Sequence, residues 1–224
     1  MESIKEPNGP VLLKKGEAVP AYARLMSDND VLSWQKKRIE NHQPQSEIFV
    51  FKYGMHILTG VAGLSGFIIN TNIRKNFRLG TLRSMFTYIP SVVLTGALAG
   101  VIHQFGIKDR VLVGKEYCSL CVSLRSGTYQ SVMGVAYSFL VSFLTCLPTA
   151  RENYTLPMPA TQKGLGYLKL LNTISPKSSI LLSLIAANMV FGCVVGQQEF
   201  SVFLNHLIQR PPSEFFIDRS FVRD

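Results

Sequence analysis

Hydrophobic residues are gathered into four long blocks along the chain rather than spread over narrow amphipathic stripes. The stretches without Asp, Glu, Lys or Arg run over residues 53–73, 84–107, 126–150 and 178–198. Helices of these lengths extend roughly 31 to 37 Å, enough to cross a hydrocarbon core of about 30 Å. Apolar and polar residues do not alternate within the blocks, which argues against a transmembrane β-barrel. The pattern predicts an all-α membrane protein with a four-transmembrane-helix bundle within residues 48–208.

Short amphipathic helices are predicted to flank this bundle. Residues 1–47 form a polar N-terminal tail, in which Ser27 and Asp30 suit a capping box that opens an amphipathic helix over residues 28–42. Trp34 stands beside three basic residues there, as in helices that lie at a membrane surface; a helix that docks on a partner protein is the alternative. Two other segments carry apolar residues suited to a surface or a partner, the loop stretch 165–174 and the C-terminal tail 209–224.

The charge distribution bears on the choice of partners. The chain is 47% hydrophobic and only 17% charged, which excludes an intrinsically disordered chain. Its formal net charge is +9, but the basic residues do not line one soluble face, so nucleic acid is not expected as a partner. Arg74, Lys75, Arg78 and Arg83 stand without an acidic residue between the first two blocks. We interpret them as a basic loop at the membrane surface, in contact with lipids and, with the loop 151–177, on the inner side.

Small residues inside the blocks predict close helix packing. Gly96 and Gly100 in the second block form a GxxxG pair, and Gly192 and Gly196 form another in the fourth. Glycines at this spacing remove side chains from one strip of the helix, which lets two helices approach closely. We expect packing within the bundle, with dimerisation as the less favoured alternative.

Polar residues within the blocks are few, and the blocks contain no acidic or basic side chain. Asn188, midway through the fourth block, is expected to form a hydrogen bond between helices. The absence of ionisable residues other than histidine, tyrosine and cysteine argues against an ion-driven transporter. A small-solute pore is an alternative, although polar residues such as Ser131, Thr145 and Asn188 define no continuous face.

Catalytic motifs are absent from the sequence apart from one pair of cysteines. There is no GxGxxG, P-loop, GxSxG or HExxH motif, so the chain is expected to be non-enzymatic, with no cofactor. Cys118 and Cys121, between the second and third blocks, can close a disulfide or stay reduced. A zinc site with His56 and His103 is disfavoured because these histidines lack paired local spacing, and no metal is expected. A membrane thiol oxidoreductase is an alternative function.

The two cysteines begin a longer motif at the entrance of the third block. The motif is Cys118-x-x-Cys121-x-x-x-Arg125-Ser126-Gly127, and it resembles the transmembrane protein 126 family of mitochondrial membrane proteins. The resemblance covers residues 48–208. Further features similar to that family's layout are Asn70, Arg74 and Lys75 at the end of the first block, Pro90 in the second, and Gly196 and Glu199 near the end of the fourth.

This resemblance implies a multi-pass protein of the mitochondrial inner membrane that acts, without catalytic activity, as a scaffold in respiratory complex I assembly. One branch of the family anchors the assembly complex of the proximal membrane arm, and the other serves the distal arm. The companions of the anchoring branch are an acyl-CoA-dehydrogenase-like flavoprotein, the ECSIT protein and an intermediate-associated assembly factor. The long N-terminal region before the first block favours the anchoring branch.

Overall fold

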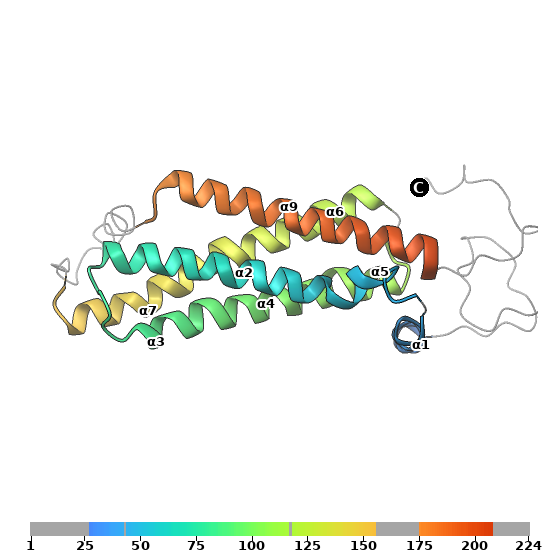
Figure 1. Cartoon of the computed structure of the whole chain (residues 1–224), viewed down its shortest axis with the longest axis horizontal. Coiled ribbons are helices and arrows are strands. Elements are labelled where there is room, and N and C mark those ends of the chain that lie inside the picture. Colours follow the sequence, from blue (N-terminus) through green and yellow to red (C-terminus); the bar gives the residue numbers. More distant parts are fainter. Residues whose placement is uncertain (1–26, 43, 117, 156–174, 208–224) are drawn as a thin grey trace, which may run out of the picture.

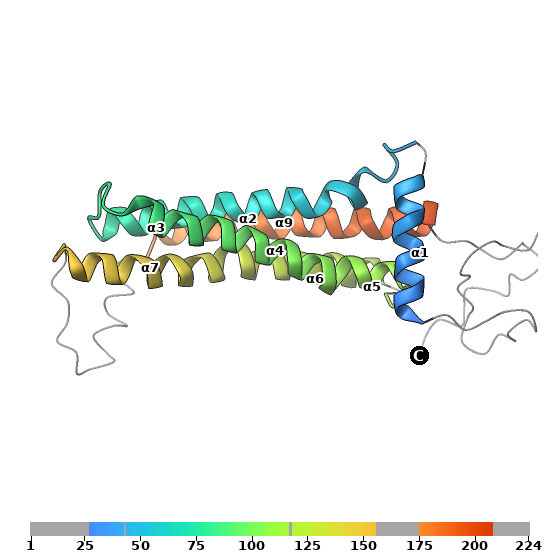
Figure 2. The same ribbon diagram turned by 90° about the horizontal axis from the view of Figure 1, so that it is seen from below.

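The computed structural model describes residues 27–42, 44–116, 118–155 and 175–207, and every regular element in these ranges is helical. These helices form long rods that lie side by side, and a short helix lies across one end of them (Figures 1 and 2). The all-helical prediction is therefore confirmed for the described part of the chain. The surface helix expected at 165–174 and the C-terminal tail lie outside the described residues.

The first rod is a single α-helix, and each of the other three joins one or more α-helices end to end with one or two π-helical segments. The crossing helix is α1 (Asp28–Asn41), and the first rod is α2 (Phe49–Asn76). The second rod joins α3 (Ser84–Ile89), η1 (Pro90–Leu94), α4 (Thr95–His103), η2 (Gln104–Lys108) and α5 (Asp109–Leu112). The third joins α6 (Ser119–Ser131), η3 (Val132–Tyr137) and α7 (Ser138–Glu152), and the fourth joins α9 (Ser178–Val202) and η4 (Phe203–Leu207).

Buried positions in the second and third rods recur every four residues. An α-helix turns once in 3.6 residues, so a stripe at this spacing drifts by about 40° per step. The wider turns of η1, η2 and η3 each absorb part of this drift and return the stripe to the bundle interior. Pro90 favours the first of them because it has no N–H for the α-helical ladder. The stripes are Thr87, Ser91, Thr95, Ala99, His103 and Ile107, and Val122, Ser126, Gln130, Gly134, Ser138, Ser142 and Cys146.

Three of the four rods are long and apolar enough to cross a membrane. They are Ser84–Leu112, Ser119–Glu152 and Ser178–Asn205. The prediction of four such spans is wrong by one, because α2, which contains the expected span 53–73, does not reach the same hydropathy. Its inner face carries small and polar residues that pack against the other rods, which lowers its average hydropathy. Helix α2 nevertheless lies alongside the other rods over its length (Figure 1).

The helices also extend beyond the charge-free blocks. The second rod continues past residue 107 through Lys108, and the fourth passes through Glu199 to Leu207. Charged residues end an apolar block, but a helix ends only where its backbone hydrogen bonds are interrupted. The fourth charge-free block ends at residue 198, one residue before Glu199, whereas the structure continues the helix through Glu199 and buries this side chain inside the bundle.

Helix α1 packs across the end of the bundle formed by α5 and η4 (Figure 2). The Ser27 side chain caps it by accepting a hydrogen bond from the Asp30 backbone N–H, as the capping box requires. Lys36 forms an ion pair with Asp109 at 3.4 Å, and Arg38 Nη1 donates to the Leu207 carbonyl at 3.0 Å. These contacts fix α1 to its own bundle at the end that also carries the start of α6.

Candidate functional site

A column of buried polar groups follows the inner face of α2, where the other three rods meet it. Polar side chains are costly in a lipid environment unless they bond to one another, so the interior is where they are satisfied. A continuous polar face was not expected from the sequence. In order along α2, the column contains Lys108 beside Phe51, His103 and Glu199 beside Gly54, Gln130 beside Leu58, Asn188 beside Ser65, Ser138 beside Gly66, and Thr87 beside Asn70 and Arg74.

A buried histidine–carboxylate pair occupies the end of the column nearest α1. His103 Nε2 lies 2.9 Å from Glu199 Oε2, and His103 Nδ1 lies 3.4 Å from Ser126 Oγ. All three residues are buried, and Glu199 has no exposed surface. A proton on Nε2 lets His103 donate to the carboxylate and leaves Nδ1 free to accept from Ser126. Lys108 Nζ, the nearest cation in the column, donates to the Phe51 carbonyl at 2.5 Å.

Glu199 changes the expectation for ion transport. An ion-driven transporter was not expected because the charge-free blocks contain no acidic or basic side chain, but Glu199, one residue past the fourth block, is buried within α9. A helical pattern signals its position, since residues 188, 192, 195 and 199 lie on one face of a helix. The burial of His103 could likewise be predicted, because His103 belongs to the stripe of buried residues that recurs every four residues in the second rod.

The middle of the column joins three rods through side-chain amides. Asn188 Nδ2 donates to Ser65 Oγ at 2.7 Å, and Gln130 Nε2 donates to the Leu58 carbonyl at 2.9 Å. Gln130 also lies 3.3 Å from Asn188 Oδ1. Asn188 thus makes hydrogen bonds between helices, as its position suggested. Elsewhere on the inner faces of the rods, three hydroxyls are buried without a hydrogen-bond partner in the described part of the chain: Thr95, Ser138 and Ser142.

Arg74 closes the opposite end of the column. Its guanidinium donates to Thr87 Oγ1 at 2.6 Å and to the carbonyls of Gly80 and Leu82 at 2.7 and 2.9 Å. The side chain is only 3% exposed, which corrects the prediction that it is a membrane-surface residue. Its role is to hold the turn after α2 against α3.

The other members of the predicted basic loop are exposed. Lys75 and Arg78 lie on the surface, and Arg83 forms an ion pair with Glu152 at the end of α7. The loop 77–83 is therefore fastened by Arg74 from inside and by Arg83 at its surface. Three basic side chains remain outside, where lipid headgroups or partners can reach them.

The Arg74→Leu substitution is expected to lower the free energy of unfolding by about 2 kcal/mol, because it leaves two backbone carbonyls without their donor. Thermal unfolding of the purified protein in detergent measures the loss. Lys75→Leu, at the neighbouring exposed position, serves as the control and is expected to change stability by no more than about 0.5 kcal/mol. Equal unfolding of both variants would contradict the assigned role of Arg74.

The predicted glycine pairs lie where helices touch. A Cβ on Gly96 would come within 2.9 Å of the Thr59 carbonyl, and one on Gly100 within 2.5 Å of Thr59 Oγ1. A Cβ on Gly192 would lie 2.7 Å from the Gly127 Cα. Such distances are too short for real side chains, so both pairs are contact strips between rods.

The Ser126-Gly127 part of the motif has a structural explanation. Gly196 packs on Ser126, since a Cβ there would lie 2.7 Å from the Ser126 Cβ, while Gly192 packs on Gly127. Arg125 and Arg110 both form ion pairs with Glu116, which connect α6 to α5. The motif therefore joins the start of α6 to α9.

Cys118 and Cys121 lie exposed at the start of α6. Both thiols are free, with their Sγ atoms 2.6 Å apart. Cys118 is the N-cap of α6, and its Sγ accepts a hydrogen bond from the Cys121 backbone N–H at 3.2 Å. The hydrogen bond from the Cys121 side chain and the one from its backbone N–H lower the pKa of the Cys118 thiol. The two thiols are therefore neighbours on the first turn of α6, within reach of each other.

The zinc alternative finds no ligand set in the described residues. No group of three or more His, Cys, Asp or Glu side chains is placed to hold a metal there. His103, one of the two histidines considered, instead faces Glu199 and Ser126 inside the bundle.

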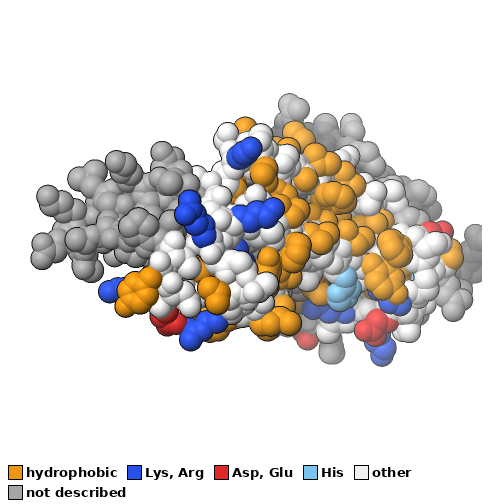
Figure 3. Space-filling view, turned by 60° about the vertical axis from the view of Figure 1, so that its left-hand side comes forward, with side chains coloured by type: hydrophobic (Ala, Val, Ile, Leu, Met, Phe, Trp, Pro, Cys, Tyr) orange, Lys and Arg blue, Asp and Glu red, His pale blue; other side chains and the backbone are white. Residues whose placement is uncertain are grey.

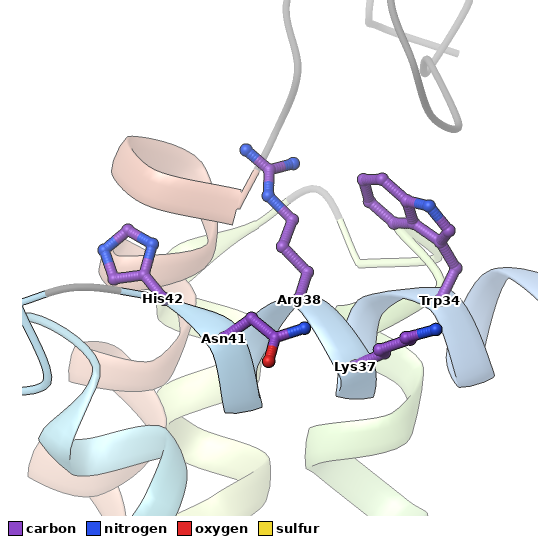
Figure 4. Close-up of a pocket in the computed structure, with 5 residues that line it drawn as sticks. All are labelled: Trp34, Lys37, Arg38, Asn41 and His42. Carbon is purple, nitrogen blue, oxygen red and sulfur yellow. The ribbon is translucent and has the colours of Figure 1, made fainter.

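An open groove lies along α1. Its lining side chains are Trp34, Lys37, Arg38, Asn41 and His42, of which Trp34, Arg38 and His42 rise from the same face (Figure 4). The Arg38 guanidinium lies 5.3 Å from the centroid of the Trp34 ring, a cation–π distance. An aromatic and basic lining suits an anionic group at the end of the bundle.

Together the helical rods and their internal polar column define a polytopic α-helical membrane protein. The sequence model of the transmembrane protein 126 family matches residues 29–213, so the chain belongs to that family. A Drosophila melanogaster protein described as Transmembrane protein 126 is 25% identical over 191 residues, which cover 83% of this chain and 85% of the relative. No solved structure matches the chain.

Proposed function

We propose that this protein is a non-enzymatic scaffold in the assembly of mitochondrial respiratory complex I, embedded in the mitochondrial inner membrane. Membership of the transmembrane protein 126 family supports this role, since the family resemblance carries that expectation. The structural observation that best supports a scaffold role is that the bundle has a polar interior and an apolar exterior.

The exterior suits contact with other membrane helices. Large apolar side chains are exposed on all four rods, including Phe67 on α2, Phe86 on α3, Leu144 on α7 and Phe191 on α9. Figure 3 shows hydrophobic side chains spread over much of one face, with Lys and Arg side chains toward both ends of it. Such a surface packs against lipid or against membrane subunits that have not yet found their partners.

The ends of the bundle suit contact with soluble proteins. Helix α1 presents its aromatic and basic groove at one end, and the exposed Lys75 and Arg78 lie at the other. In this proposal the basic end faces the matrix, as its positive charge favours. The partners are complex I membrane-arm subunits and intermediates, the acyl-CoA-dehydrogenase-like flavoprotein, ECSIT and the intermediate-associated assembly factor.

Native gel electrophoresis of mitochondria tests this proposal. The tagged full-length protein is expected to migrate with complex I assembly intermediates, and its removal is expected to reduce mature complex I while intermediates accumulate. Mature complex II serves as the control, since its assembly is expected to be unchanged. A protein that migrates apart from all complex I intermediates, with normal complex I after its removal, would contradict the role.

The polar column favours a small-solute pore as a second candidate. Three buried hydroxyls of the bundle, those of Thr95, Ser138 and Ser142, have no hydrogen-bond partner in the described part of the chain and are groups to which a neutral solute could bond. The two functions differ in one readout, because a pore raises the permeability of liposomes that contain the purified protein. A scaffold leaves that permeability unchanged.

A further inference from the structure

The two exposed thiols at the start of α6 are not used by the scaffold role. We propose that Cys118 and Cys121 form a thiol–disulfide exchange site, in which Cys118 attacks a disulfide presented at the α1 end of the bundle and Cys121 resolves the product. The proposal stands independently of complex I assembly.

The backbone places the two cysteines in different roles. Cys118 is at the N-cap, where the positive end of the helix dipole and the Cys121 backbone N–H at 3.2 Å stabilise a thiolate. Cys121 lies one turn into α6, with its thiol 2.6 Å from Cys118 Sγ, and donates to it. The structure therefore provides one sulfur stabilised for attack and a second within reach of it.

The surroundings keep the site rigid and open. Glu116 forms ion pairs with both Arg110 in α5 and Arg125 in α6, which connect the end of the second rod to the helix that carries Cys121. Ser126 and Gly127 fasten the same helix to α9. The Leu120 side chain, between the two cysteines, is 67% exposed and offers an apolar contact for a disulfide-bearing molecule.

The exchange needs only a disulfide as co-reactant. The Cys118 thiolate attacks one sulfur of that disulfide, the S–S bond breaks, and the leaving thiolate takes up a proton. Cys121 then loses its proton to solvent and attacks Cys118 Sγ, which breaks the mixed disulfide and releases the second thiol. The Cys118–Cys121 dithiol is oxidised by two electrons, and the co-reactant is reduced to two thiols.

The other cysteines do not provide this chemistry. Cys146 is buried and donates to Asn70 Oδ1 at 3.4 Å, and Cys193, on α9, packs against Gly127 of α6. They serve as internal controls because both remain in every variant below.

Trapping with purified full-length protein in detergent tests the proposal. The reduced protein is mixed with glutathione disulfide or with oxidised thioredoxin, and adducts are read by mass spectrometry. Wild type is expected to gain a Cys118–Cys121 disulfide, Cys121→Ser to hold the mixed disulfide on Cys118, and Cys118→Ser to form several-fold less adduct. An adduct with glutathione alone indicates a low-molecular-weight co-reactant, and one with thioredoxin indicates a protein co-reactant. No adduct with either, in protein that remains folded, would overturn the proposal.

A pH profile separates the attacking thiolate from an ordinary exposed thiol. The pKa of Cys118 is lowered, so its thiolate persists to lower pH and the midpoint of iodoacetamide alkylation is expected below that of a free cysteine. Cys121→Ser keeps a side-chain donor, whereas Cys121→Ala removes it, so the midpoint is expected to be higher in the alanine variant. Equal midpoints in both variants, at the value of free cysteine, would contradict the proposed role of Cys118.

Discussion

The Glu199→Leu variant is expected to lose about 1 to 3 kcal/mol of unfolding free energy, the usual cost of leaving a buried hydrogen-bond donor without its partner. Leucine leaves His103 Nε2 without the carboxylate that lies 2.9 Å away, in a part of the bundle with no access to water. Chemical denaturation of the purified protein in detergent measures this loss, and the variant is also expected to be less abundant in cells.

Two further variants test whether the loss of stability comes from the missing His103–Glu199 pair or from a general disturbance of α9. Gln198→Leu introduces leucine at the adjacent exposed position and is expected to leave stability nearly unchanged. The double variant His103→Leu with Glu199→Leu removes both polar groups and is expected to recover part of the loss. If Glu199→Leu unfolds like Gln198→Leu, the pair does not stabilise the bundle.

The helical class of the protein could be predicted because an apolar block of about 20 residues in a membrane must satisfy its backbone hydrogen bonds internally, and an α-helix does so. Both glycine pairs were also recognisable, since removal of side chains at four-residue spacing has a direct steric meaning. Their partners were not, because Thr59 and Ser126 lie in other rods and only the three-dimensional packing brings them to the glycines.

The buried polar column was missed for a different reason. The blocks were bounded by charged residues, so Arg74 was assigned to a loop and Glu199 to the edge of the fourth span, although helix geometry continues through both of them. The four-residue stripes of the second and third rods were visible in the sequence. Their regularity over more than five turns indicates π-helical turns, because a continuous α-helix would rotate such a stripe out of the interior.

The pairing of polar side chains inside the bundle also explains why α2, one of the four predicted spans, is not among the helices apolar enough to cross a membrane. Hydropathy treats a polar residue as a cost of entering lipid, whereas Asn70, Arg74 and Ser65 in α2 face other helices. A helix whose polar groups are paired inside the bundle can be less apolar than the rods around it. Average hydropathy and position in the bundle therefore carry different information.

Substitution of Gly192 by leucine is expected to separate α6 from α9 and to cost more than about 3 kcal/mol of stability, since overpacking of this strip cannot be relieved by a side-chain rotation. Even a Cβ at this position would lie 2.7 Å from the Gly127 Cα and 2.8 Å from the Ser126 carbonyl. Both neighbours are backbone atoms of α6, so the helices themselves must move apart. Denaturation in detergent and migration with partner complexes measure the effect.

Gly60 provides the matched control for this prediction, because it lies in α2 and a Cβ there meets nothing within 4 Å. Gly60→Ala is expected to stabilise the helix by up to about 1 kcal/mol through the higher helix propensity of alanine. Gly192→Ala is expected to have the opposite sign, a loss of about 1 to 3 kcal/mol, because the steric cost exceeds the same gain in propensity. Stabilisation by both alanine variants would show that α6 and α9 do not make the close contact on which the Ser126-Gly127 motif depends.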